Sequence, residues 1–176
     1  MNKAALLVIA VQEALVAAQP YREGEFLALL RRLIARSRER GAEVVFVRHD
    51  DGEGSELEAG SPGWQVCAAL SPADGEKIVD TRFNSAFVGT GLDDYLRARG
   101  VRRLILAGMQ TEYCIDATCK AAFERGYAVV IPEGATTTFD NGPLPADVLC
   151  EFYERRIWDG RFAQVLPIEQ TEELLG

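Results

Sequence analysis

Strand-length apolar runs alternate with stretches of helical period along the whole chain, and this alternation restricts the fold more than any other feature. The first run, 4–11, is rich in Leu, Val and Ile without a polar interruption, as strands covered on both faces of a parallel sheet are. Further strands are predicted at 43–48, 77–81, 103–108, 127–132 and 162–166, and helices at 26–40, 92–99, 111–122, 144–158 and 168–175. The pattern predicts an α/β fold, a doubly wound, mainly parallel six-stranded sheet with helices on both faces.

The totals fit one domain over residues 1–176, because a chain with 48% hydrophobic and 26% charged residues can bury one ordinary core. No apolar run approaches the roughly 18 residues that span a bilayer, so we expect a cytoplasmic protein with no membrane partner. The net charge of -8 argues against nucleic acid as a partner, since phosphate binding needs clustered Lys and Arg. The four cysteines lack zinc or disulfide spacing and are expected to be reduced.

The run at 103–108 ends at a glycine and leads directly into a helical pattern, so a strand is predicted to turn into a helix there. Thr111 is a candidate N-cap, which places Cys114 at the third helical position. The positive end of a helix dipole lowers the pKa of a thiol, and the thiolate is the nucleophile of cysteine chemistry. The alternative is that Cys114 only packs in the core, as free cysteines most often do.

The predicted sheet brings candidate residues to one edge, because ligands of open α/β sheets bind outside the carboxyl ends of the strands. That edge holds Ala10, His49, Thr81, the 109–114 turn and Glu133. A small pocket around Cys114 is expected to be lined by Gln12, His49, Trp64, Phe83, Phe87, Tyr113 and Phe139. The alternative for most of these side chains is core packing.

Three segments in the same order resemble one family. They are Leu-Leu-Val-Ile-Ala-Val-Gln at 6–12, Phe-Asn-Ser-Ala-Phe-Val-Gly-Thr at 83–90 and Gly-Met-Gln-Thr-Glu-Tyr-Cys at 108–114. Together they resemble the isochorismatase-like cysteine hydrolases, which include nicotinamidases and N-carbamoyl amidohydrolases. The resemblance implies a nucleophile at Cys114, a cis peptide bond at Met109-Gln110, and an oxyanion hole formed by the main-chain N–H groups of Gln110 and Cys114. It also implies a homo-oligomer, either a dimer or a tetramer.

Two catalytic positions depart from the family pattern. The resemblance implies an aspartate where this chain has Ala10, and a lysine six residues before Phe87, where it has Thr81. Losing a general acid and base usually costs about 100-fold to 10,000-fold in rate. We therefore expect a hydrolase that acts through Cys114 on a small amide, carbamoyl or ester substrate, with impaired or altered chemistry. The alternative is an inactive relative that binds a small molecule or a partner.

Other charged residues are candidates for the missing groups. Lys77 lies four residues before Thr81, about 13 Å along a strand and too far for the same task, and Asp80 is predicted to point to the opposite face. Carboxylates in strand-end loops are better placed, namely Glu13, Glu112, Glu133 and Asp140. Glu112 and Glu133 are the first to test, and the alternative for both is an exposed loop or cap residue.

No cofactor is expected. In the nicotinamidase branch of the family, the segment after the second strand supplies an Asp and several His to a metal, whereas this chain has one histidine, His49, beside Asp50 and Asp51. The alternative for His49 is a strand-ending or capping role. Residues 89–91 are too short for a phosphate loop, and no full G-x-G-x-x-G or Walker pattern occurs. The sequence thus predicts neither a metal nor a nucleotide cofactor, and a small molecule as the main partner.

Overall fold

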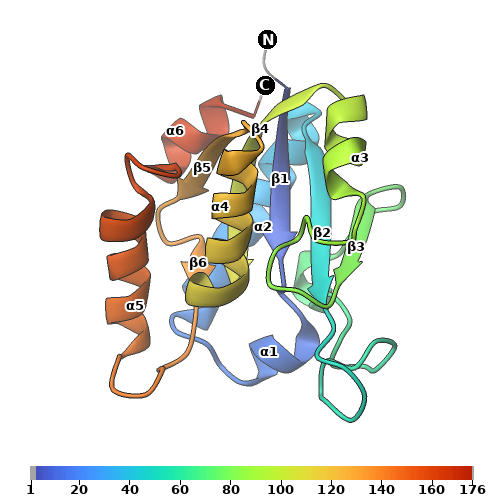
Figure 1. Ribbon diagram of the computed structural model, residues 1–176, viewed down its shortest axis with the longest axis vertical. Coiled ribbons are helices and arrows are strands. Elements are labelled where there is room, and N and C mark those ends of the chain that lie inside the picture. Colours follow the sequence, from blue (N-terminus) through green and yellow to red (C-terminus); the bar gives the residue numbers. More distant parts are fainter. Residues whose placement is uncertain (1–2, 176) are drawn as a thin grey trace.

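The computed structural model describes residues 3–175, which form an α/β fold around one parallel sheet (Figure 1). The main strands run in the order β3-β2-β1-β4-β5-β7. Their bounds are β1 (Lys3–Ile9), β2 (Glu43–His49), β3 (Lys77–Thr81), β4 (Val101–Met109), β5 (Ala128–Pro132) and β7 (Gln164–Leu166). A short additional strand, β6 (Thr136–Thr137), pairs with the end of β4. The predicted fold class is confirmed.

Helices cover both faces of this sheet. They are α1 (Glu13–Ala17), α2 (Glu23–Arg40), α3 (Leu92–Ala98), α4 (Asp116–Glu124), α5 (Ala146–Phe152) and α6 (Ile168–Glu173). Figure 1 shows α3 and α4 in front of the sheet and α2 behind it. The core has two matching layers: Leu7 of β1 packs in the layer of Cys119 in α4, and Leu6 packs in the layer of Phe26 in α2. No helix between residues 3 and 175 combines the length and the apolar character needed to cross a membrane.

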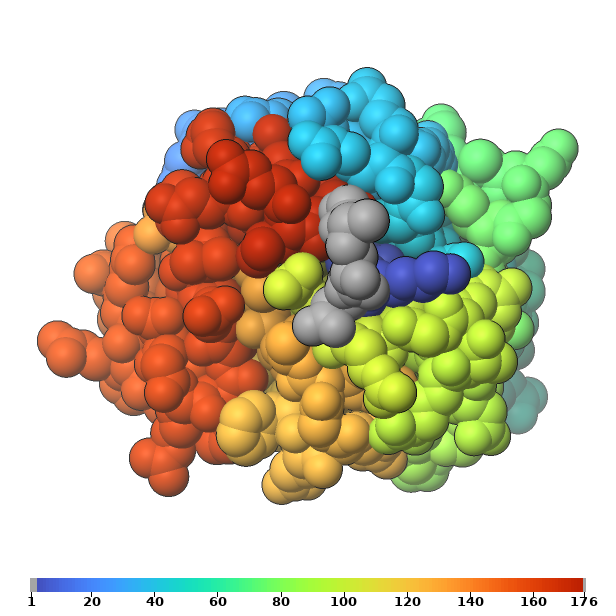
Figure 2. All heavy atoms as spheres, turned by 90° about the horizontal axis from the view of Figure 1, so that it is seen from above, coloured from blue at the N-terminus to red at the C-terminus, as the bar shows by residue number. Residues whose placement is uncertain are grey.

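The strand order reverses at β1, because β2 and β3 lie on one side of it and β4 lies on the other. The strand pairs are parallel, so the carboxyl ends of β1, β2, β3 and β4 share one edge, the lower edge in Figure 1. Figure 2 shows the opposite end, where α2, α6 and the turn before β4 surround the start of β1. Ligand sites of such sheets lie at the carboxyl ends, beside the reversal.

The chain after β1 differs from the prediction. The strand stops at Ile9 rather than at residue 11, because Ala10 has a left-handed backbone with φ 52°. Residues Glu13–Ala17 then form α1, a helix that is not among those predicted. The first two amides of this helix donate to the carbonyl oxygens of Gln65 (2.9 Å) and Gly63 (3.0 Å). Contacts with a distant loop therefore fix this five-residue helix.

The carboxyl-terminal third also differs in detail. The strand β6 (Thr136–Thr137) is the seventh of the sheet, whereas the sequence predicted six. The predicted helix at 144–158 is α5 followed by a π-helical turn, Tyr153–Trp158. Trp158 is fully buried, and its indole N–H donates to a carboxylate oxygen of Asp116 in α4 at 3.0 Å. The wider turn thus seats a large side chain against α4.

Candidate active site

Cys114 lies in the turn that joins β4 to α4. Gly108 of β4 approaches β1 so closely that a Cβ would sit 2.0 Å from a β1 carbonyl oxygen, and its φ of 136° is a conformation that favours glycine. The Met109-Gln110 peptide bond is cis, the form that the resemblance implies. Residues Thr111–Ile115 then form a π-helical turn that leads into α4.

Thr111 does not cap this helix with its side chain, so the predicted N-cap is wrong. The Thr111 side chain is fully buried, and its Oγ1 lies 3.2 Å from Oγ1 of Thr136 in β6. The carbonyl oxygen of Gln110 accepts hydrogen bonds from the amides of Tyr113 (3.1 Å) and Ile115 (3.2 Å). Main-chain bonds and the contact with β6 therefore hold the turn.

The Cys114 side chain is 7% exposed, and its sulfur lies 3.8 Å from Oδ1 of Asn84. Burial, followed by the Asp51 carboxylate, raises the pKa of the thiol to about 11, although the main-chain amide of Gln110 acts to lower it. The predicted low pKa is therefore wrong, because burial of the sulfur disfavours the charged thiolate. With its pKa raised in this way, the thiol would need a proton acceptor in any reaction in which its sulfur acts as a nucleophile.

The sulfur borders a cavity of about 320 Å³ at the carboxyl edge of the sheet. The lining residues are Ala10, Leu15, His49, Asp51, Leu57, Asn84, Gln110, Tyr113 and Cys114. A cavity of this size fits a small molecule. Five predicted site residues thus meet around one space, namely Ala10, His49, Gln110, Tyr113 and Cys114.

Sequence reasoning missed the other lining residues. Leu57 carried a signal, because it is the single large apolar residue in the polar segment 50–61 and is 6% exposed. Asn84 belongs to one of the segments that resemble the family, so its position was also open to prediction. For Asp51, the sequence raised only the role of a metal ligand. Among residues 3–175, no three His, Cys, Asp or Glu side chains gather closely enough to hold a metal ion.

Ala10 and Thr81 both lie at this edge without supplying a charge. Ala10 is 1% exposed, lines the cavity, and donates its amide to Val47 of β2 at 2.8 Å. Thr81 is the partner of His49 in the β2–β3 pairing. Its Oγ1 accepts the amide of Phe83 at 3.0 Å, so the hydroxyl shapes the turn after β3.

His49 and Asp51 form a polar pair at the end of β2. Nε2 of His49 lies 2.8 Å from Oδ1 of Asp51, with side chains 14% and 56% exposed respectively. Gln12 is fully buried and holds the His49 main chain: its Nε2 donates to the carbonyl oxygen at 2.9 Å, and its Oε1 accepts the amide at 2.8 Å. Gln12 thus positions the strand end and does not line the cavity, which corrects its predicted place.

Four aromatic residues predicted around Cys114 lie elsewhere. Trp64 and Phe83 line a separate cavity of about 370 Å³. Phe87 is 7% exposed and packs in the core. Phe139 is half-buried and does not border the Cys114 cavity. The aromatic residue type therefore predicts neither burial, since Phe83 is 57% exposed, nor which space a ring faces.

Comparison with known proteins places this geometry in a family. A family model of the isochorismatase domain matches residues 4–146. The chain belongs to the isochorismatase family. A solved isochorismatase family protein is 34% identical to it, with a TM-score of 0.86 over 93% of this chain and 97% of that one.

Several curated relatives of this isochorismatase family chain carry enzyme names, and two serve as examples. Streptothricin hydrolase of Streptomyces noursei is 37% identical over 143 residues, which are 80% of this chain and 52% of that protein. Ureidoacrylate amidohydrolase of Variovorax paradoxus is 29% identical over 140 residues, which are 62% of this chain and 55% of that protein. The chain spans about half the length of each.

None of the four predicted substitute carboxylates of this isochorismatase family protein lines the cavity that Cys114 borders. Glu13 and Asp140 accept main-chain amide bonds of 2.7 Å and 2.9 Å, as residues that hold loops do. Glu112 accepts a bond from the Asn141 side chain at 3.3 Å. These three carboxylates have structural roles.

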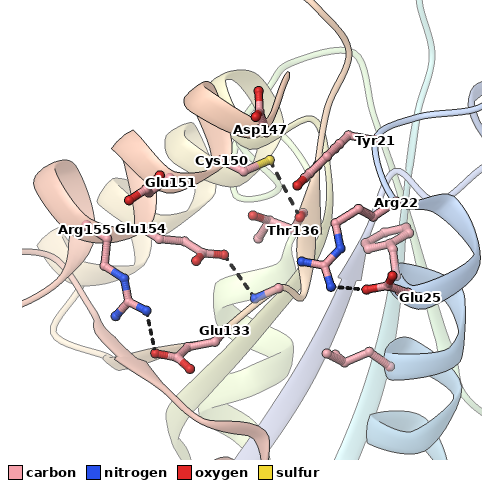
Figure 3. A pocket seen from close by; sticks show the side chains of 13 residues that line it. Tyr21, Arg22, Glu25, Glu133, Thr136, Asp147, Cys150, Glu151, Glu154 and Arg155 are labelled. Atoms are coloured by element: carbon pink, nitrogen blue, oxygen red, sulfur yellow. Dashed lines mark hydrogen bonds and ion pairs between the residues drawn. The ribbon is translucent and has the colours of Figure 1, made fainter. Parts of the chain in front are cut away.

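Glu133 belongs to a different cavity, of about 460 Å³ (Figure 3). There it pairs with Arg155 at 2.8 Å, and Figure 3 shows Arg22 beside Glu25 in the same cavity. This cavity shares no lining residue with that of Cys114. Glu133 is therefore also placed away from the sulfur.

Proposed function

We propose that this protein hydrolyses a small amide, carbamoyl or ester substrate through an acyl intermediate on Cys114. The observation that carries the proposal is the position of the sulfur, which borders the 320 Å³ cavity and lies within reach of the Gln110 main-chain amide. The cavity occupies the sheet edge at which ligands of this fold class bind. The names of streptothricin hydrolase and ureidoacrylate amidohydrolase support hydrolysis of such a bond.

The chemistry is acyl transfer in two halves. Sγ of Cys114 attacks the carbonyl carbon and gives up its proton, and the main-chain N–H groups of Gln110 and Cys114 bind the oxygen as it becomes negative. One such donor is worth about 100-fold to 1000-fold in rate. The leaving amine or alcohol takes up a proton and departs. Water then hydrolyses the acyl group and restores the thiol.

We further propose that Ala10 and Thr81 shift the preference toward esters and thioesters. An amine must be protonated to leave, whereas an alkoxide or a thiolate needs less help from an acid. Neither side chain can supply that proton. Losing a general acid and base costs about 100-fold to 10,000-fold, so slow amide turnover is expected.

A binding protein without turnover is the second candidate, and the raised pKa of the Cys114 thiol favours it. A thiol of this kind does not attack unaided. In this case the cavity would hold a small molecule reversibly and leave Cys114 unmodified.

The deciding experiment uses p-nitrophenyl acetate as a probe and peptide mass spectrometry to find the acetyl group. We expect acetylated Cys114, and at least a tenfold slower release of nitrophenol from Cys114→Ala. Cys119→Ala is the matched control, because Cys119 lies on α4 with no exposed surface. Equal release by wild type and Cys114→Ala, or an unmodified Cys114, would favour the binding protein.

We also propose that the protein self-associates, as the resemblance implies; its cytoplasmic location stays a prediction. Val148 and Phe152 of α5 are 48% and 50% exposed, and Leu144 before them is 47% exposed. These side chains form an apolar stripe, and such patches on soluble proteins often mark contacts with another chain. Light scattering with Phe152→Glu tests this, and a monomer at all concentrations in the wild type contradicts it.

A further inference from the structure

We propose that Asp51 and His49 take over proton transfer at Cys114, with Asp51 carrying the proton as a catalytic residue and His49 holding Asp51 as a positioning residue. This inference rests on the proposed hydrolase function and deepens it. It supplies the acid and base that Ala10 and Thr81 do not provide. The pair comes from the end of β2, a strand to which the family pattern assigns no member of the triad.

The position of β2 in the sheet supports the proposal that its end replaces the two substituted positions. β2 lies between β1 and β3, the two strands whose ends carry the substituted positions. His49 pairs directly with Thr81, and the amide of Ala10 donates to Val47 at 2.8 Å. Because His49 follows Val47 by two residues, both face the same side of the sheet, and Val47 packs in the core layer that contains Cys114. His49 and Asp51 therefore follow a strand that lies between Ala10 and Thr81, and His49 is on the side of the sheet where Cys114 packs.

The contact between the two side chains indicates which ring nitrogen of His49 carries the hydrogen. Nε2 lies 2.8 Å from Oδ1 of Asp51, and an ionised carboxylate can only accept a hydrogen bond. Nδ1 is buried and has no hydrogen-bond partner within the described part of the chain. A buried donor without a partner is costly, so a hydrogen on Nδ1 is disfavoured. The imidazole thus donates to Oδ1, and Oδ2 is left to accept a proton.

The Asp51 carboxylate reaches the sulfur electrostatically. Asp51 and Cys114 line the same cavity, and Asp51 is the only carboxylate among its lining residues. Its negative charge contributes to the raised pKa of the Cys114 thiol, as a charge does on a neighbouring acid that would also become negative. Once the sulfur bonds to a carbonyl carbon, its proton is lost readily to such a base.

The loop that carries Asp51 is anchored on both sides. Oδ1 of Asp50 accepts the amides of Gly52 at 2.8 Å and of Ala59 at 3.3 Å, and Leu57 is buried against the cavity. The Asp51 side chain is nevertheless 56% exposed. It can therefore exchange a proton with water while its loop stays in place.

Every proton is accounted for in both halves of the reaction, which are acylation of Cys114 and hydrolysis of the acyl group. The thiol proton moves to Oδ2 of Asp51 as the S–C bond forms, and Asp51 gives it to the leaving amine or alkoxide as the C–N or C–O bond breaks. In the second half, the attacking water loses a proton to Asp51 as its oxygen bonds to the acyl carbon. Asp51 returns that proton to the sulfur as the C–S bond breaks. His49 keeps its N–H throughout and stabilises the ionised carboxylate.

The test measures two rates at Cys114 in the full chain at pH 8, namely hydrolysis of p-nitrophenyl acetate and alkylation by iodoacetamide. Asp51→Asn removes the proton acceptor and also a negative charge near the sulfur. We expect the Cys114-dependent hydrolysis to fall about 100-fold. We expect alkylation to become faster, because loss of that charge lowers the pKa of the thiol. A change that only disturbed the site would slow both rates.

Two substitutions of His49 test its positioning role separately from the catalytic role of Asp51. His49→Gln keeps a side-chain N–H donor and is expected to retain most of the hydrolysis, whereas His49→Ala loses the donor and about tenfold of the rate. Asp80→Asn is the matched control, because Asp80 binds Arg48 at 2.8 Å and 3.0 Å and points to the opposite face of the sheet, as predicted. It should leave both rates unchanged.

The outcomes distinguish failure of the proton-transfer role of Asp51 from failure of the proposed hydrolase function. If Asp51→Asn hydrolyses the probe as fast as wild type while Cys114→Ala does not, this inference fails and the proposed function stands. This inference alone also fails if hydrolysis and alkylation slow together in Asp51→Asn. If wild type shows no hydrolysis that depends on Cys114, the proposed function fails and this inference fails with it.

Discussion

The turn after β4 and the end of β1 border one cavity, and Thr81 at the end of β3 lines the neighbouring one, yet the turn and the strand ends are built differently. In the proposed mechanism the turn would act through the main-chain amides of Gln110 and Cys114, and Gly108 and the π-helical turn fix the backbone there. The strand ends would act through side chains, and here they carry Ala10 and Thr81. A site built from the main chain changes only if the fold changes, whereas a side chain can be replaced without disturbing the sheet.

The backbone and the side chain of Ala10 illustrate this difference. Its backbone is left-handed, with φ 52°, a conformation that costs an alanine roughly 1–2 kcal/mol and that Asp and Asn adopt more readily. The side chain at this position thus lacks a carboxylate, while the main chain keeps a shape that suits one. The backbone at the end of β1 thus suits the aspartate that the family resemblance implies there, although the side chain is an alanine.

The substitution with the largest expected effect is Gly108→Ala, which tests whether the close approach of β4 to β1 fixes the turn. The new Cβ would lie 2.0 Å from the carbonyl oxygen of Ile9, at a φ of 136°, so β1 and β4 would have to separate. We expect the free energy of unfolding to fall by more than about 4 kcal/mol, which for a protein of this size often prevents folding. Urea denaturation followed by circular dichroism measures the change.

Gly24→Ala is the control for this substitution. Gly24 lies near the start of α2, and no atom lies within 4 Å of a Cβ placed there. An alanine in a helix is more stable than a glycine by up to about 1 kcal/mol. A Gly108→Ala protein as stable as wild type would show that the turn is not fixed by this contact.

The next test restores the side chains that the strand ends lack, through Ala10→Asp together with Thr81→Lys. Ala10 borders the cavity of Cys114, and Thr81 lies beside His49 in the sheet. The pair supplies a carboxylate and an ammonium group to a turn that is already formed. We expect a gain of about 100-fold in hydrolysis that depends on Cys114, measured on a simple amide.

Each single substitution serves as a control and should give a smaller gain, since a buried charge without a partner is unfavourable. In the restored protein, Asp51→Asn should have little further effect, because the new aspartate replaces it. A folded double variant with no gain would show that the main-chain turn is not competent for catalysis.

Much of the fold could be predicted because the apolar runs are local signals. The unbroken run of β1 indicates a strand buried on both faces, and the helical stripe of α2 indicates its packing side. By contrast, α1 depends on amide bonds to Gly63 and Gln65, and β6 depends on pairing with the end of β4. Such elements are fixed by partners distant in sequence, so a local pattern does not reveal them.

The candidate site divides in the same way. The resemblance located Cys114 and the two substituted positions by sequence alone. It could not distinguish Asp50 from Asp51, which are adjacent in sequence but differ in space. Asp50 bonds to its own loop and pairs with Arg82 at 3.4 Å, whereas Asp51 faces the cavity. The raised pKa of the thiol was also missed, because burial is a tertiary property.

The smallest effect concerns the reactivity of Cys114 against pH. The thiolate is the species that iodoacetamide alkylates, and the pKa of this thiol is raised to about 11. Between pH 8.5 and 10.5 the alkylation rate should therefore rise about 75-fold, whereas a thiol with an ordinary pKa of about 8.5 would gain about twofold. Mass spectrometry of the peptide that contains Cys114 separates its rate from those of the other cysteines.

The raised pKa of the Cys114 thiol also makes the free energy of unfolding depend on pH. The protein loses stability at high pH, and this loss limits the pH range of the alkylation test. The folded state favours the neutral thiol, so its contribution to stability is fully present below the unfolded pKa of about 8.5 and is lost as pH rises through about 11. Circular dichroism at each pH must therefore confirm that the protein is folded. A midpoint near 8.5 in folded protein would mean that the sulfur is less buried than the turn implies. Asp51→Asn should lower the midpoint, because it removes one of the two causes that raise it.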